Sequence, residues 1–204
     1  MPKSAHIFEL TGGVLCLDFV NTVDHRLSPE RFVDHLRSYG DLLVFGLQAG
    51  MFSRAERAQL ERVAARNLAE ARRVVRQAAQ LREAIYRTFS ALAAGRQPQQ
   101  EDLGVLDRHA QAAVRHMRLQ AANGGFRWQW MEQPTLEAPL WRIAKSAADL
   151  LTSAEAQAVR ECAAETCGWL FVDRSRNHLR RWCDMKICGN RVKARRHYQR
   201  TRRA

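Results

Sequence analysis

The chain has 204 residues and a formal net charge of +12, with 46% hydrophobic and 26% charged residues. This length allows one domain with its own core plus a small module, and the hydrophobic fraction excludes a chain that is disordered throughout. No apolar run approaches the roughly 18 residues of a membrane span, and the N-terminus lacks the pattern of a secretory signal. We therefore expect a cytoplasmic location.

The excess positive charge lies almost entirely at the C-terminal end. Residues 174–204 contain 12 Lys or Arg and one acid, Asp184, whereas the other 173 residues contain 21 basic and 20 acidic groups. Basic charge concentrated in one short segment indicates a surface that binds a polyanion, most often nucleic acid.

The first predicted elements come from apolar runs and helix caps. Residues 14–23, VLCLDFVNTV, are rich in apolar and β-branched residues and follow two glycines, which predicts a buried strand. Residues 28–33 are compatible with a short helix or an edge strand. A helix is predicted over residues 38–50, ending at Gly50, and Ser53 is the predicted N-cap of the next helix.

The clearest periodic segment predicts a long helix ending near Gly95. Its apolar residues recur every three or four positions, on one helical face: Val74, Ala78, Leu81, Ile85, Phe89 and Leu92. The next helix is predicted over residues 101–117. Its predicted inward residues are Leu103, Leu106, Ala110, Ala113, Val114 and Met117.

A turn and a strand follow that helix. Residues 123–125, NGG, are a strong turn signal. Phe126, Trp128 and Trp130 then alternate with polar residues, which predicts a strand whose aromatic side chains pack in the core. A final amphipathic helix is predicted over residues 140–153. The predicted fold class is therefore α+β: a mostly helical domain with a small sheet over residues 1–153, followed by a small module over residues 154–204.

Four of the five cysteines lie within 27 residues and are spaced C-x4-C-x15-C-x4-C: Cys162, Cys167, Cys183 and Cys188. Two close pairs supply the four soft ligands of a tetrahedral Zn²⁺ site, and in a cytoplasmic chain a metal site is favoured over disulfides. A short basic segment also needs metal stabilisation, because it cannot build a core of its own. We expect one structural Zn²⁺ per chain; His178 and His197 are alternative ligands, and Cys16 is expected in the core.

Two segments resemble known families. Residues 162–196 resemble the CGNR zinc finger in their four cysteines, the segment 173–176, the run Arg180-Arg181-Trp182-Cys183 and the signature Cys188-Gly189-Asn190-Arg191. Residues 15–22, LCLDFVNT, are similar to the first motif of the ABATE domain, which accompanies this finger in proteins assigned as bacterial stress-induced transcription regulators. The resemblance implies a treble-clef-like finger, with the second cysteine pair at the start of a helix, and a role in binding DNA.

The basic module supplies the candidate nucleic-acid contacts. They are Arg180, Arg181, Asn190, Arg191, Lys193, Arg195, Arg196 and Arg200. Arginine and lysine side chains suit phosphate contacts, and Asn190 with Arg191 or Arg195 are candidates to reach base edges. Duplex DNA is the predicted partner. RNA is the alternative, because an arginine-rich helix does not distinguish between polyanions.

The larger domain suggests a second hypothesis, a sensor for a small-molecule effector. Three polar residues lie within or at the end of the first apolar run: Asp18, Asn21 and Thr22. On this hypothesis they form the rim of a ligand pocket. Ordinary turn chemistry and capping explain the same residues. In a sensor of this kind the finger would mediate protein interaction. A homodimer is left open, and no catalytic set emerges from the sequence, so an enzyme is not expected.

Overall fold

The structure is a computed structural model that describes residues 6–131 and 135–202, except for the side chains of Arg196, His197 and Arg200. Its helices are α1 (Leu15–Val20), α2 (Tyr39–Gln48), α3 (Arg54–Arg66), α4 (Leu68–Ala93), α5 (Gln100–Arg115), α6 (Ala138–Leu151) and α7 (Asn190–Thr201). Its strands are β1 (Val23–Asp24), β2 (Val33–Asp34), β3 (Met117–Ala122), β4 (Gly125–Trp130), β5 (Val159–Glu161) and β6 (Leu170–Val172).

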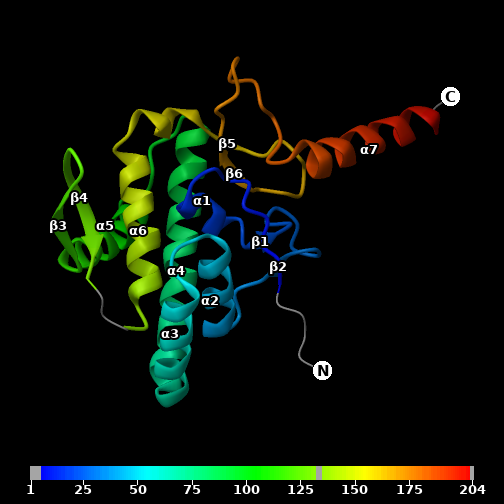
Figure 1. The fold of residues 1–204 in the computed structure, drawn as a ribbon. Helices are drawn as coiled ribbons and strands as arrows, with labels where there is room; N and C mark the ends of the chain where they lie inside the picture. The colour runs from blue at the N-terminus through cyan, green and yellow to red at the C-terminus, as the bar shows by residue number, and fades with distance from the viewer. Residues whose placement is uncertain (1–5, 132–134, 203–204) are drawn as a thin grey trace.

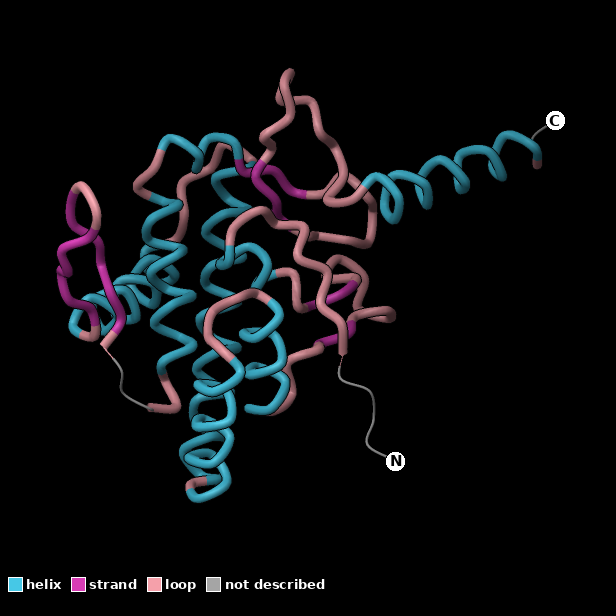
Figure 2. Tube along the Cα trace, in the orientation of Figure 1, coloured by secondary structure: helices cyan, strands magenta, loops and turns pink. Residues whose placement is uncertain are grey.

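The helices α1 to α6 form a helical body, and three antiparallel two-stranded hairpins lie around it (Figures 1 and 2). Helices α4, α5 and α6 pack on one another, while α2 and α3 pack on α4. Helix α7 projects away from the body at the end of the chain (Figure 1). The α+β class is confirmed. Among the described residues, no helix combines the length and the apolar character needed to cross a bilayer.

The prediction of a strand over residues 14–23 is wrong, because residues 15–20 form the helix α1. Four of its six residues, Cys16, Leu17, Phe19 and Val20, are buried, and α1 contacts α4, α6 and β6. A mostly apolar helix of fewer than two turns is too short to show a helical period, so its sequence resembles that of a buried strand. The backbone N–H of Gly12 donates to Asp18 Oδ1 at 2.7 Å, and a Cβ on Gly12 would lie 2.8 Å from the Asp18 nitrogen.

The predicted N-cap of α3, Ser53, is confirmed, and Ser38, the first residue of the helix predicted over residues 38–50, is the N-cap of α2. Ser38 and Ser53 both form capping boxes, in which the serine side chain accepts from the backbone of Asp41 or Glu56 and the carboxylate accepts in return. Helix α2 ends just before Gly50, which has a φ of +67°. Of residues 28–33, left open between helix and strand, only Val33 enters a strand, at the start of β2.

The long periodic helix is also confirmed, as the 26-residue α4. Five residues of its predicted stripe are buried: Val74, Ala78, Leu81, Ile85 and Phe89. Leu92 is partly buried against the same core. One helical face thus contacts α1, α2, α5 and α6, and α4 is the central element of the body.

Helix α5 ends earlier than predicted, at Arg115, and Met117 begins the strand β3, which the sequence did not reveal. Val114, predicted to face inward, is 50% exposed. Residues 125–130 form a strand, β4, as predicted, but the predicted burial is wrong for Phe126, which is 80% exposed, and Trp128, which is 50% exposed; Trp130 is partly buried. The cross-strand neighbours of Phe126 and Trp128 on β3 are Ala121 and Leu119. A period of two indicates two unlike faces, and it does not indicate which face is covered.

The main hydrophobic core continues past the predicted end of the first domain at residue 153. Val159, Leu170 and Val172 of the hairpin β5–β6 belong to the same core as the helices of the body. A second, smaller core surrounds the four cysteines of the C-terminal module and includes Trp169 and Phe171. The division at residue 153 stays a prediction, and it does not coincide with a gap in the packing.

Candidate zinc centre and nucleic-acid interface

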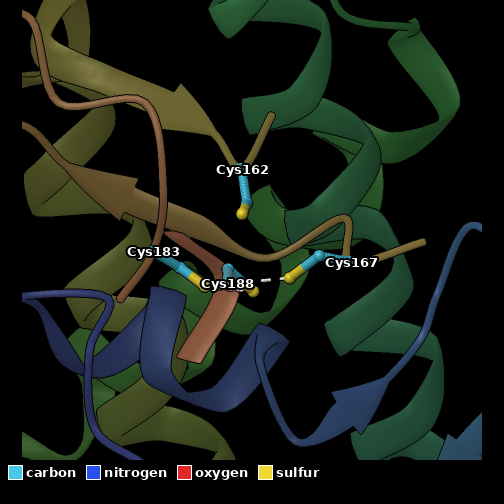
Figure 3. Close-up of side chains that lie close together, drawn as sticks. All are labelled: Cys162, Cys167, Cys183 and Cys188. Carbon is cyan, nitrogen blue, oxygen red and sulfur yellow. Dashed lines mark hydrogen bonds between the residues drawn. The ribbon is translucent and has the colours of Figure 1, made fainter. Parts of the chain in front are cut away.

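The four clustered cysteines come from four different turns of the chain. Cys162 follows β5, and Cys167 lies in the turn that leads into β6. Cys183 comes after a long loop, and Cys188 lies in a π-helical turn, Met185–Gly189, that continues directly into α7. Figure 3 shows the four side chains converging on one another.

The sulfur geometry fits one metal ion. All four Sγ atoms lie within 4.8 Å of one another, and Cys183 Sγ is 3.7 Å from Cys167 Sγ and 3.6 Å from Cys188 Sγ. A regular tetrahedron with Zn–S bonds of about 2.3 Å would separate its sulfurs by about 3.8 Å. All four cysteines are buried. They therefore form a single structural zinc site, in which Zn²⁺ would cross-link the four turns and leave no coordination position for water.

A basic side chain lies beside the cysteine cluster. Hydrogen bonds among the thiols lower the pKa of Cys162 and raise those of Cys167 and Cys183, so the thiols alone do not stabilise four thiolates. Arg191 Nη2 lies 3.1 Å from Cys188 Sγ. Because Zn²⁺ with four thiolates carries a net charge of −2, this guanidinium offsets part of the charge and orients Cys188.

The turn around Cys167 is held by the loop between β1 and β2. The backbone N–H of Arg26 donates to the carbonyl of Cys167 at 3.1 Å, and that of Leu27 donates to Thr166 at 3.3 Å. Gly168 has a φ of +73°, and a Cβ there would lie 3.1 Å from the Cβ of Arg26. A side chain at position 168 would therefore be strained by its backbone and crowded by that loop.

The residues predicted to bind an effector have partners within the protein. The Asn21 amide donates to the carbonyl of Leu170 and accepts from its N–H, both at 2.9 Å. Thr22 Oγ1 donates to the Phe19 carbonyl, and Asp18 accepts from Gly12 as described above. A ligand site at Asp18, Asn21 and Thr22 stays a prediction. Asn21 also borders a cavity of about 160 Å³ between the body and the zinc site.

Asp18 differs from Asn21 and Thr22 because it has an ionisable group, and its side chain is partly buried. Burial raises the pKa of Asp18 to about 6, and the hydrogen bond from the Gly12 N–H opposes that rise only in part. Asp18 lies in α1 among four buried apolar residues, Cys16, Leu17, Phe19 and Val20.

Arg180 and Arg181 lie at the end of the finger loop, residues 174–181, and face different ways. Arg180 Nε donates to the Trp182 carbonyl at 2.9 Å, its guanidinium also contacts the Cys183 carbonyl, and it lies 4.3 Å from the centre of the Phe171 ring. Arg181 is exposed. The buried carboxylate of Asp173 accepts from the backbone at both ends of this loop, Ser175 and Arg180. These two hydrogen bonds fix the conformation of the finger loop.

The remaining candidate contacts belong to α7, which contains five basic residues and no acid. Asn190, Lys193 and Arg195 are exposed, and Val192 packs against the zinc core. Arg195 forms an ion pair with Glu165 in which both side chains are more than half exposed. Arg196, Arg200 and the alternative ligand His197 have side chains outside the described set. The other alternative, His178, directs Nδ1 at the Asp173 carbonyl.

Sequence reasoning missed two sets of polar contacts made by α4, one with β2 and one with β5 of the finger. Arg82, only 2% exposed, binds both carboxylate oxygens of Asp34 at 2.8 and 2.6 Å. Further along α4, Tyr86 and Ser90 donate to the carboxylate of Glu161, which precedes Cys162. Charged residues on an amphipathic helix normally face solvent, so nothing in the pattern distinguished these from their exposed neighbours.

Comparison with known families agrees with this arrangement. Residues 13–154 match the ABATE family, which is described as a "putative stress-induced transcription regulator". The chain belongs to the ABATE family. Residues 158–201 of this ABATE protein match the CGNR zinc finger, so the finger that contains the four cysteines follows the ABATE domain directly. No curated protein matches the chain significantly.

Proposed function

We propose that this ABATE protein is a transcription regulator that binds duplex DNA through α7 and the finger loop. The observation that carries the proposal is an acid-free helix with five basic residues that begins at the zinc site and projects away from the body (Figure 1). Such a helix exposes positive charge with little apolar surface to bury, which suits a phosphate backbone. A treble-clef-like finger and a response to stress are parts of the same proposal.

The exposed side chains receive different roles in this proposal. Lys193 and Arg195 contact phosphates, and Arg195 exchanges its exposed partner Glu165 for the DNA, at little cost because exposed ion pairs contribute little. Asn190, at the start of α7, is the candidate for reading a base edge. Arg191 positions the helix through Cys188, and Arg180 supports the finger loop from inside.

The phosphate contacts are tested through salt dependence. Each contact to duplex DNA adds about 0.9 to the slope of log affinity against log salt concentration. Fluorescence anisotropy of a labelled duplex, titrated over a range of KCl concentrations, should give a slope smaller by about 1.8 for Lys193→Ala/Arg195→Ala. Arg62→Ala/Arg66→Ala is the matched control, because it removes two exposed charges from α3 and should leave the slope unchanged.

Base reading is tested separately. On a duplex selected for tight binding, Asn190→Ala should cost about 1–3 kcal/mol, and on random duplex much less. Equal losses on the two duplexes would reduce Asn190 to a backbone contact. Competition of the selected duplex against structured RNA distinguishes DNA from the RNA alternative. A zinc-loaded protein without salt-sensitive affinity for any duplex would contradict the proposal as a whole.

A further inference from the structure

A groove lies between α2, α3 and α4 in the helical body, and none of the four clustered cysteines lines it. Its volume is about 610 Å³, within the usual range of small-molecule sites. The groove is lined by apolar side chains from all three helices, including Leu43 of α2, Ala64 of α3 and Val75 of α4. Leu68, at the start of α4, is 62% exposed in this groove. Apolar surface of this extent is available to a hydrocarbon or aromatic group.

Three arginines border this apolar surface: Arg37, Arg72 and Arg76. Arg72 and Arg76 are four residues apart on α4, so their side chains lie on the same helical face. Across the described ranges, neither of them has a carboxylate within ion-pair distance, whereas Arg73 between them pairs with Glu70 and Glu137.

The acid that borders the groove does not balance these charges. Glu61 of α3 pairs with Arg57, one turn earlier on the same helix. The Arg37 side chain donates to the backbone carbonyl of Asp34. A carbonyl group has no net charge, so this contact does not neutralise the guanidinium of Arg37. The groove therefore combines an apolar floor with a rim of net positive charge.

We infer that this groove binds an organic anion with an apolar body, such as a carboxylate or phosphate monoester that carries an alkyl or aryl group. The anionic head lies between Arg72 and Arg76, which supply planar, multiple N–H donors suited to carboxylate and phosphate oxygens. The apolar body lies on Ala64, Leu68 and Val75, which line the groove with accessible surface. Burial of apolar groups supplies affinity, and the arginines supply the selection for an anion.

The test uses the full-length, zinc-loaded protein and three probes below any micelle-forming concentration. Isothermal titration calorimetry should detect binding of decanoate, and binding at least tenfold weaker for decanol, which lacks the charge, and for acetate, which lacks the apolar body. Arg72→Ala/Arg76→Ala should weaken decanoate binding at least tenfold. Arg62→Ala/Arg66→Ala removes the same charge from exposed positions that do not line the groove, and should bind decanoate like the unchanged protein.

A second variant tests the apolar floor. Val75→Trp should fill the groove and abolish decanoate binding while zinc content and helical circular dichroism are retained; Val75→Leu is the milder variant if tryptophan disturbs folding. Decanol binding as tight as decanoate, or undiminished decanoate binding in Arg72→Ala/Arg76→Ala, would overturn the inference. Because no DNA is present in these titrations, their outcome does not depend on whether α7 binds a duplex.

Discussion

The two halves of the finger are attached to the molecule in different ways. The first half, residues 159–172, places Val159, Leu170 and Val172 in the core of the helical body and is hydrogen-bonded to Asn21. The second half, residues 183–201, has the last two cysteines and α7, and its apolar contacts are with the small zinc core. The first half is held by packing and the second mainly by the metal ligands.

This difference changes what zinc contributes to the fold. In an isolated finger, the binding energy of the metal is the folding energy of the whole module. Here the hairpin β5–β6 is already held by the body, so the metal mainly fixes the second half and the direction in which α7 leaves the molecule. The proposed DNA-binding helix is therefore the element most dependent on zinc.

The largest expected effect comes from removing a ligand of the second half. In Cys188→Ser, we expect loss of zinc and of ordered structure from residue 183 onward, while β5, β6 and the helical body stay folded. Zinc-finger peptides gain about 10–16 kcal/mol from zinc binding, so little of the second half should survive its loss. Hydrogen exchange read by mass spectrometry should show lost protection at 183–201 and retained protection at 159–172.

The matched control for this experiment is Cys16→Ser, since Cys16 is buried in α1 and lies outside the cluster. This variant should destabilise the body and still contain one zinc per chain. Equal loss of protection in both halves of the finger on Cys188→Ser would show that packing does not hold the first half.

Asn21→Ala tests the hydrogen bonds that attach the first half of the finger to the helical body. It leaves the N–H and the carbonyl of Leu170 without partners in a buried position, each at a cost of about 1–3 kcal/mol. We expect a free energy of unfolding lower by about 2–4 kcal/mol in urea denaturation, with zinc still bound. Asn21→Asp, which keeps an acceptor for the Leu170 N–H, separates the two hydrogen bonds.

Arg191→Ala tests how far the contact between Arg191 and Cys188 contributes to zinc binding in the second half of the finger. Removal of the guanidinium from Cys188 Sγ should weaken zinc binding about tenfold, as is usual for partners that orient a metal ligand. Competition with a chromophoric chelator measures this affinity. Lys193→Ala, an exposed change two residues further along α7, should leave zinc affinity unchanged; equal losses in the two variants would assign the effect to general charge.

The smallest expected effect is a pH dependence at Asp18. Its raised pKa means that the folded protein binds a proton more tightly than the unfolded chain, so the contribution of Asp18 to stability falls as pH rises from about 4 to 6. Between pH 5 and 7.5, Asp18→Asn should gain about 1 kcal/mol relative to the unchanged protein. Urea denaturation of both proteins at the two pH values measures this change, and a constant difference would contradict it.

The elements that sequence analysis predicted correctly are those with a local signal. The stripe of α4 and the capping serine of α3 depend on neighbours within a turn or two, and the cysteine spacing depends on the chemistry of one metal ion. Residues that act across long separations were not predictable. Asn21 bonds to a residue 149 positions away, and only the fold shows that Arg191 faces a sulfur.

The errors have the same origin. Helix α1 is short and mostly buried, so its sequence shows no helical period, and the apolar face of β4 lacks the cover that its alternation led us to expect. In both cases, burial is a property of the surrounding elements.

Helix α4 reaches from the α2–α4 groove to the zinc site without interruption. Arg72 and Arg76 lie near one end, and Tyr86 and Ser90 bond Glu161, the residue before Cys162, near the other. At about 1.5 Å per residue, the 14 residues from Arg72 to Tyr86 span about 21 Å. Thermodynamic linkage is reciprocal, so an anion that changes the affinity for zinc must have its own affinity changed by zinc by the same factor. The anion in the groove and the structural zinc would then be coupled through one continuous helix, α4.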